Sequence, residues 1–258
     1  MNPDNFITLG ILVVAMMACV IGCNRLGKRL ALTDNYSSQH INHIELMQGS
    51  LLGLLALVMG FTFSLALSRY DSRSEAVSVE ANTMVDVVAL AELLPAEFRQ
   101  PVAEITRQYI RLRIEAGQYL VDDPVRLSLL DETRKVQLEL WKLAYDAADV
   151  TDSAVKAGLF INALNEMLDA RAAREAQLHR QVPPPVLWLL FLTFLFTASV
   201  IGYTAGLSRH APSSAAAAFL LLIVGLMGVI IDLDHPRDGL IKIDQSSLQQ
   251  VGQELGIE

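Results

Sequence analysis

Four long stretches of this sequence are apolar and contain no Asp, Glu, Lys, Arg or His. They are Phe6–Cys23, Leu51–Ser68, Val186–Ser208 and Ala215–Ile231. Each offers about the 17 to 25 residues with which a helix crosses roughly 30 Å of hydrocarbon. A helix also satisfies its own backbone hydrogen bonds where no water is present. The pattern therefore predicts an all-α integral membrane protein with four transmembrane helices.

The region between the second and third stretches is polar enough to fold in water. From Arg69 to Val182 it holds 14 Lys and Arg against 19 Asp and Glu. Apolar residues recur at helical spacing from Ser72 to about Leu94, without Pro or Gly. This spacing predicts that the second transmembrane helix continues into the soluble region as one long helix.

Three more helices are expected in the soluble region from their boundary signals. The first runs from Pro95 to Tyr119. The second has Asp122 or Asp123 as its N-cap and Pro124 in its first turn, and it reaches about Ala148. The third begins with Thr151 or Asp152 as its cap, and it ends near Arg180, before a run of three prolines.

These signals divide the chain into four parts. They are a first transmembrane pair at residues 1–68, a soluble helical domain at 69–185, a second transmembrane pair at 186–231, and an acidic C-terminal tail at 232–258. Lys and Arg near the helix ends number seven on the side of the soluble domain and four on the other side. The positive-inside rule thus favours a cytoplasmic soluble domain and cytoplasmic termini, although Arg25, Lys28 and Arg29 after the first helix favour the opposite orientation.

Charge and motifs exclude several classes of function. The net charge of −8 argues against a nucleic-acid surface. No phosphate-binding loop, nucleophile elbow or paired metal-ligand motif occurs, so neither an enzyme nor a cofactor is predicted. Arg107, Arg111 and Arg113 could form an anion site, but their acidic neighbours favour surface ion pairs. The apolar stretches also lack the ionisable groups that pumps use to relay charge.

The second apolar stretch carries a resemblance to bestrophins. The matching residues are Gly60, Phe61, Ser64, Arg69 and Tyr70. The chain as a whole resembles the bacterial bestrophin-like domain family, in the segment 60–69, in Glu80-Ala81-Asn82, and in the tail segment 233–239. The resemblance implies a homo-oligomeric, pentameric ion channel of a bacterial inner membrane, surrounded by lipid and conducting inorganic ions.

The same resemblance implies roles for individual residues. A hydrophobic neck of the pore would be formed by Phe61, Leu57 and Gly53, which lie four apart and so share one helix face. Ser64 would offer a hydroxyl to the passing ion. At the cytoplasmic mouth the resemblance places Arg69, Tyr70 and Asn82. Gly53 is smaller than the residue that the family carries there.

A calcium clasp of animal bestrophins would fall near Asp232, Asp234 and Asp238. In this chain the acidic run is interrupted, so we expect no metal, and these three residues are the weak candidate for calcium.

A non-conducting protein is the alternative. Gly53, Gly60 and Ser64, with Ala56, present small side chains that would allow membrane helices to pack closely without a pore. In that case the chain is a multi-pass scaffold or signalling protein whose helical domain binds a cytosolic partner.

Overall fold

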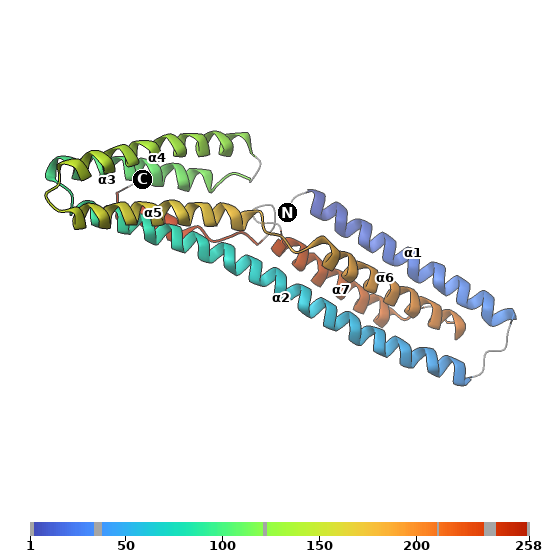
Figure 1. The fold of residues 1–258 in the computed structure, drawn as a ribbon. Helices are drawn as coiled ribbons and strands as arrows, with labels where there is room; N and C mark the ends of the chain where they lie inside the picture. Colours follow the sequence, from blue (N-terminus) through green and yellow to red (C-terminus); the bar gives the residue numbers. More distant parts are fainter. Residues whose placement is uncertain (1–2, 34–37, 121–122, 211, 235–240, 257–258) are drawn as a thin grey trace. The chain divides into compact units, whose positions relative to one another are not determined.

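The computed structural model describes residues 3–33, 38–120, 123–210, 212–234 and 241–256. These residues form eight helices and no strand (Figure 1). The helices are α1 (Pro3–Thr33), α2 (Ser38–Ala91), α3 (Ala96–Ala116), α4 (Pro124–Val150), α5 (Ala154–Leu178), α6 (Pro184–Leu207), α7 (Ser214–Asp234) and α8 (Ser246–Glu254). Four of them, α1, α2, α6 and α7, are long and apolar enough to cross a membrane, as predicted.

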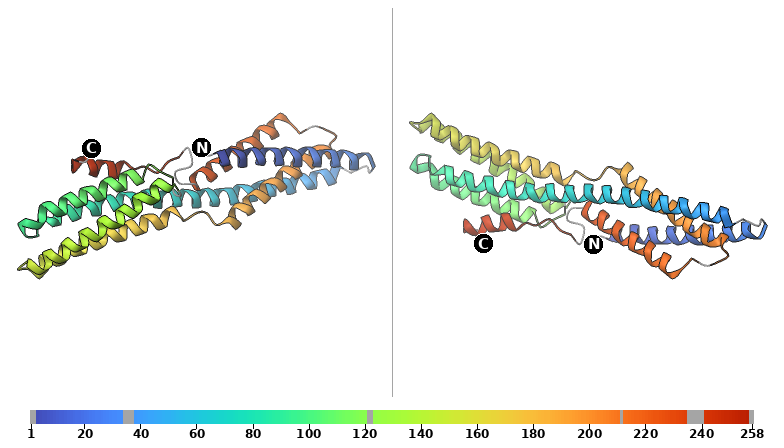
Figure 2. Two further views of the ribbon diagram at one scale, coloured as in Figure 1. Left: turned by 90° about the horizontal axis from the view of Figure 1, so that it is seen from above. Right: turned by 90° about the horizontal axis from the view of Figure 1, so that it is seen from below.

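The chain divides into two compact units. The first, the spanning unit, comprises Met1–Arg69 and Gln181–Ile241, and the second, the helical unit, comprises Tyr70–Arg180 and Lys242–Glu258. Helix α2 contributes to both, since it is one uninterrupted helix of 54 residues (Figure 2). The prediction that the second apolar helix continues into the polar region is therefore confirmed.

In the spanning unit, α1 and α6 pack closely because glycines let their backbones approach. A Cβ on Gly202 or Gly206 would overlap the backbone of α1 at Val20 or Asn24, and a Cβ on Gly27 would lie 2.5 Å from the Tyr203 carbonyl oxygen. The buried Asn24 adds interhelical hydrogen bonds, because its Nδ2 donates to the carbonyl oxygen of Gly202 at 3.3 Å. Small residues and polar contacts of this kind hold membrane helices together where no hydrophobic effect acts between them.

The helical unit is a bundle with an apolar core drawn from five helices. Fully buried side chains include Met84 of α2, Ile110 of α3, Leu140 of α4, Phe160 of α5 and Leu248 of α8. Because α8 contributes to this core, the C-terminal segment is part of the bundle.

Of the two N-caps predicted from the sequence, the structure has that of α4 and differs at that of α5. Asp123 caps α4 as predicted, with its Oδ1 accepting from the Val125 N–H at 2.8 Å. The predicted cap of α5, Thr151 or Asp152, is wrong, because Ser153 is the N-cap. Thr151 still belongs to the end of α4, since its N–H donates to the carbonyl oxygen of Ala147 at 3.1 Å.

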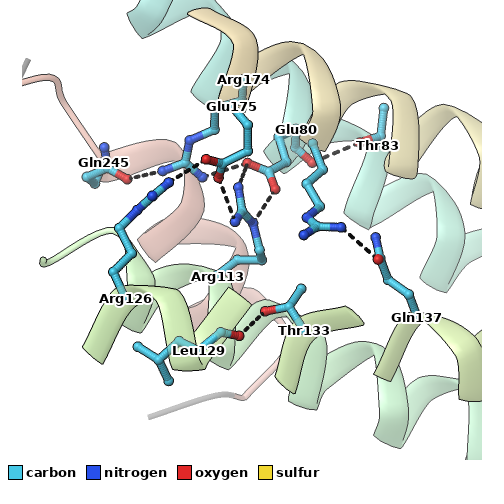
Figure 3. A network of polar contacts seen from close by, with 11 residues as sticks. Glu80, Thr83, Arg113, Arg126, Leu129, Thr133, Gln137, Arg174, Glu175 and Gln245 are labelled. Carbon is cyan, nitrogen blue, oxygen red and sulfur yellow. Dashed lines mark hydrogen bonds and ion pairs between the residues drawn. The ribbon is translucent and has the colours of Figure 1, made fainter. Parts of the chain in front are cut away.

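A buried network of charged side chains joins the helices of this unit (Figure 3). At its centre lies Glu80 of α2, whose side chain is fully buried. Arg113 of α3 donates to both Glu80 carboxylate oxygens, from Nε at 2.6 Å and from Nη2 at 3.2 Å. Arg174 of α5 donates from Nη1 to Glu80 Oε2 at 2.6 Å. One carboxylate of α2 is thus held by two other helices.

A second carboxylate extends the network to α4. Glu175 of α5 accepts from Arg113 Nη1 at 3.1 Å and also forms an ion pair with Arg126 of α4. Arg174 donates from Nη2 to Gln245 Oε1 at 2.8 Å, which ties in the segment before α8. Charge-assisted and bidentate contacts of this kind are the strong ones.

The network determines the ionisation of both glutamates. Burial alone raises the pKa of Glu80, but the adjacent guanidinium groups of Arg113 and Arg174 outweigh it and lower the pKa below its ordinary value of 4.5. For Glu175, burial likewise opposes Arg113 and Arg126, and the pKa is again lowered. Both carboxylates are therefore ionised at neutral pH.

We expect Gly202→Ala to destabilise the spanning unit by about 1–3 kcal/mol, because its Cβ forces α1 and α6 apart. The measurement is the midpoint of thermal unfolding of the detergent-purified protein. The control is Gly225→Ala in α7, where an added Cβ meets nothing within 4 Å. Equal midpoints for the two variants would contradict the close α1–α6 packing.

We expect Glu80→Gln to cost about 3–5 kcal/mol, because it removes the buried negative charge that pairs with the buried guanidinium groups of Arg113 and Arg174. The control is Glu92→Gln, which breaks the exposed pair with Arg99 and should cost less than about 1 kcal/mol. The measurement is the free energy of unfolding from denaturant titrations. If Glu80→Gln lowered it as little as Glu92→Gln does, the central role of Glu80 would be contradicted.

The network also predicts the pH dependence of stability. The pKa of Glu80 is lower in the folded state than its ordinary value of 4.5. Such a carboxylate stabilises the folded protein fully at a pH above its pKa in the unfolded chain. This stabilisation is lost as the pH falls through its pKa in the folded protein. The contribution of these carboxylates to the unfolding midpoint should therefore stay constant above about pH 6 and decrease below about pH 4.5. In Glu80→Gln the fall should be shallower, and an unchanged slope would contradict the assignment.

Candidate functional site

One face of α2 is left uncovered by the rest of the chain in the spanning unit. Leu55, Thr62 and Ala66 are buried and form the packed face. The predicted neck residues lie on the opposite face. Phe61 is 68% exposed and Leu57 is 55% exposed, and Gly53 and Ser64 are exposed as well. The four residues thus share one outward face of α2.

Two glycines on the outward side of α2, Gly53 and Gly60, pack against nothing within the described residues. A Cβ added to Gly53 or Gly60 would meet no atom within 4 Å. This contrasts with Gly202 and Gly206 of α6, which are in close contact with α1. Within this chain, close helix packing through glycines is therefore made by α6 against α1. The outward face of α2 is open to lipid or to another chain.

The exposed face of α2 continues with acidic residues at the same helical spacing in the helical unit. Asp71, Glu75, Asn82 and Asp86 are all exposed. The spacing of 4, 7 and 4 residues keeps them on one side of the helix, while Glu80 is buried on another. Along its length, this face changes from apolar at Leu57 and Phe61 to acidic.

Asn82 and Asp86 also border a polar hollow between α2 and α8. The hollow has a volume of about 400 Å³, and α8 contributes Ser247, Gln250 and Glu254 to its lining. Ser247 is held close to α2 by a 3.0 Å hydrogen bond between its hydroxyl and that of Ser78.

The three residues expected at the mouth of a pore are not gathered at one place. Arg69 and Tyr70 lie off the exposed face, and Tyr70 packs against the core of the helical unit. Its hydroxyl donates to the carbonyl oxygen of Lys242 at 3.5 Å. Only Asn82 shares the outward face with the neck residues.

The acidic residues at the end of α7 bind backbone groups. Asp234 is buried, and its Oδ1 accepts from the Val182 N–H at 2.7 Å, while Asp232 Oδ2 accepts from the Ile241 N–H at 2.8 Å. Asp238 lies outside the described residues. Among the residues that are described, no group of three His, Cys, Asp or Glu side chains is placed to hold a metal ion.

Sequence reasoning missed the network around Glu80. Arg107 does form the expected surface ion pair, with Glu104 at 3.2 Å. The same interpretation is wrong for Arg113, which is 2% exposed and bound to Glu80. The available signal was its position: Arg113 lies one turn after Tyr109 and one turn before Ala116, so it belongs to the core-facing side of α3.

The fold matches solved structures over nearly the whole chain. A variant of a bacterial bestrophin homologue from Klebsiella pneumoniae superimposes with a TM-score of 0.68 at 15% identity, covering 95% of this chain and 96% of that one. Another structure of a bacterial bestrophin homologue from that organism, phased with zinc, gives a TM-score of 0.64 at 16% identity, covering 94% and 96%. At such low identity the likeness establishes the fold.

The sequence itself identifies the family. No curated protein matches the chain. The model of the bestrophin-like domain, however, matches residues 10–248, which is nearly the full length. The chain therefore belongs to the family of proteins with a bestrophin-like domain.

Proposed function

We propose that this protein is a homo-oligomeric ion channel of a bacterial inner membrane, with α2 of each subunit lining the pore. The supporting observation is the outward face of α2, where Leu57 and Phe61 are more than half exposed in the single chain. One subunit brings one such helix, so a pore requires several copies around an axis. A pentamer is the number that the family resemblance implies.

The chemistry of this face supports a role for each part. Rings of Leu57 and Phe61 would form a dry neck that gates by excluding water. Gly53 widens one end of the neck, and Ser64 offers a hydroxyl near the other. Beyond the apolar part, Asp71, Glu75 and Asp86 would line the cytoplasmic part of the pathway with negative charge. This charge favours cations over anions.

The alternative is a non-conducting membrane scaffold. It draws support from α4, where Trp141 and Tyr145 stack with ring centroids 5.6 Å apart and Leu138 and Tyr145 are 66% and 62% exposed. Such a surface suits a partner protein. Stoichiometry separates the two functions, since a monomer or dimer does not surround a pore with one helix per subunit.

The test of the proposal is ion flux through purified protein in liposomes, with the mass of the assembly measured in detergent on the same sample. Flux from a pentamer supports the channel. Absence of flux from a monomer or dimer would refute it and direct the search to cytosolic partners.

We expect Phe61→Ala to increase flux severalfold without lowering the unfolding midpoint, because this side chain is exposed in the subunit and would narrow the neck. The control is Leu67→Ala, which removes an exposed apolar side chain from a different face of α2 and should leave flux unchanged. Unchanged flux with a lower midpoint or a smaller assembly would show that Phe61 acts in packing.

A further inference from the structure

A polar hollow lies in the spanning unit near the N-terminal end of α2, between α2, α6 and the start of α7. It has a volume of about 460 Å³, and its lining includes Glu45, Gln48, Thr204, Ser208 and Ser213. A 2.8 Å hydrogen bond from the Thr204 hydroxyl to Gln48 Oε1 joins α6 to α2 here. Among the described residues that line the hollow, Glu45 alone is charged, and it is exposed. The hollow therefore offers one negative charge among hydroxyl and amide groups.

A second hollow, the apolar trough, lies further along α2 and α7. It has a volume of about 210 Å³ and is lined by apolar side chains alone, among them Leu55 and Met59 of α2 and Phe219 and Leu222 of α7. Leu55 is 1% exposed, whereas Phe219 and Leu222 are 46% and 71% exposed. The trough thus has a buried floor and walls that are open to the membrane.

The two hollows form one groove, because successive turns of the same two helices line them. On α2 the lining residues from Gln48 to Met59 follow at spacings of 4, 3 and 4, which keeps them on one side of the helix. On α7 the lining from Ala216 to Leu226 has spacings of 3, 4 and 3. The groove therefore changes from polar to apolar within about one turn of each helix. Phe61 belongs to a different side of α2.

The dimensions of the groove fit one lipid molecule. Helix α2 rises about 16 Å from Gln48 to Met59, which is about half of the hydrocarbon thickness and so one leaflet. Glu45 lies about 9 Å before the apolar stretch that begins at Leu51, at the depth of the headgroups. Spread over a rise of about 10 Å from Leu52 to Met59, the volume of the trough makes it about 5 Å across. That width suits a single hydrocarbon chain and is too narrow for a helix of about 10–12 Å.

We propose that this groove binds one phospholipid whose headgroup carries a primary amine, as in phosphatidylethanolamine. One acyl chain lies in the apolar trough, and the ammonium group donates to the Glu45 carboxylate. The hydroxyls of Ser208 and Ser213 are donors for the lipid phosphate.

The charge of Glu45 selects among headgroups. An anionic headgroup such as phosphatidylglycerol would add a second negative charge with no cation to pair with Glu45. A quaternary ammonium group, as in phosphatidylcholine, has no N–H to donate. The site lies within one chain and on a different side of α2 from Phe61, so it does not rest on the proposed channel function.

The test is native mass spectrometry of the full-length protein in detergent, titrated separately with dioleoyl phosphatidylethanolamine and dioleoyl phosphatidylglycerol. We expect one molecule of the amine lipid per subunit, bound about tenfold more tightly than the anionic lipid, which is the difference that one hydrogen-bonded ion pair makes. Glu45→Gln should remove this preference. The control is Asp71→Asn, which removes an exposed carboxylate beyond the other end of the apolar stretch of α2 and should keep the preference.

A second variant tests the trough. Ala56 is exposed and lines it, so Ala56→Phe should fill it and weaken the binding of both lipids about tenfold. Ala218→Phe, which enlarges an exposed residue of α7 that lines neither hollow, should bind lipid as the unaltered protein does. Unfolding midpoints without added lipid show that each variant is folded, and Glu45→Gln changes only an exposed side chain.

Three results would overturn the proposal. They are equal affinity of the unaltered protein for the two lipids, a preference for the amine lipid that survives Glu45→Gln, and unchanged lipid binding by Ala56→Phe together with a smaller assembly. The last result would assign the trough to contact with a neighbouring subunit.

Discussion

The burial of Glu80 is the constraint on which the helical unit depends. A carboxylate that loses all its water needs charged partners, and here Arg113 and Arg174 supply them from two other helices. Because both partners approach the same side of α2, they determine which way this helix is turned about its axis. The outward position of Asn82 and Asp86 is a consequence of that orientation.

Helix α2 combines a packed face with an uncovered one in both units. Its packed side is largely apolar in both units, at Leu55 and Ala66 in the first and at Met84 in the second, where the buried Glu80 adds a charge. Its uncovered side changes from apolar at Phe61 to acidic at Asp86. An apolar side chain such as Phe61 is also stable against lipid, but copies arranged around an axis would use it as a constriction. This is the physical basis for proposing a channel of this bestrophin-like chain.

The glycines show how one residue type takes different roles. Gly202 and Gly206 are needed because α1 lies against their Cα atoms, and Asn24 adds hydrogen bonds at the same contact. Gly53 and Gly60 meet no neighbour within the chain. Sequence spacing alone makes both pairs look like helix-packing motifs, and only the positions of the neighbouring helices separate them.

The sequence by itself determined the elements that depend on local chemistry. Apolar stretches without charge predicted the four membrane helices, an uninterrupted helical pattern predicted the length of α2, and Asp123 before Pro124 predicted the start of α4. The four-residue spacing of Gly53, Leu57 and Phe61 also placed them on one face. Each of these follows from contacts within about one helical turn, which a linear pattern contains.

Only the tertiary structure decided which faces are covered. Arg113 looked like a surface residue because its acidic partner, Glu80, is 33 positions away in sequence and on a different helix. Arg69 and Tyr70 adjoin the neck segment in sequence, yet they lie off its outward face. Burial and charge balance are sums over neighbours from several helices, and those neighbours are set by packing.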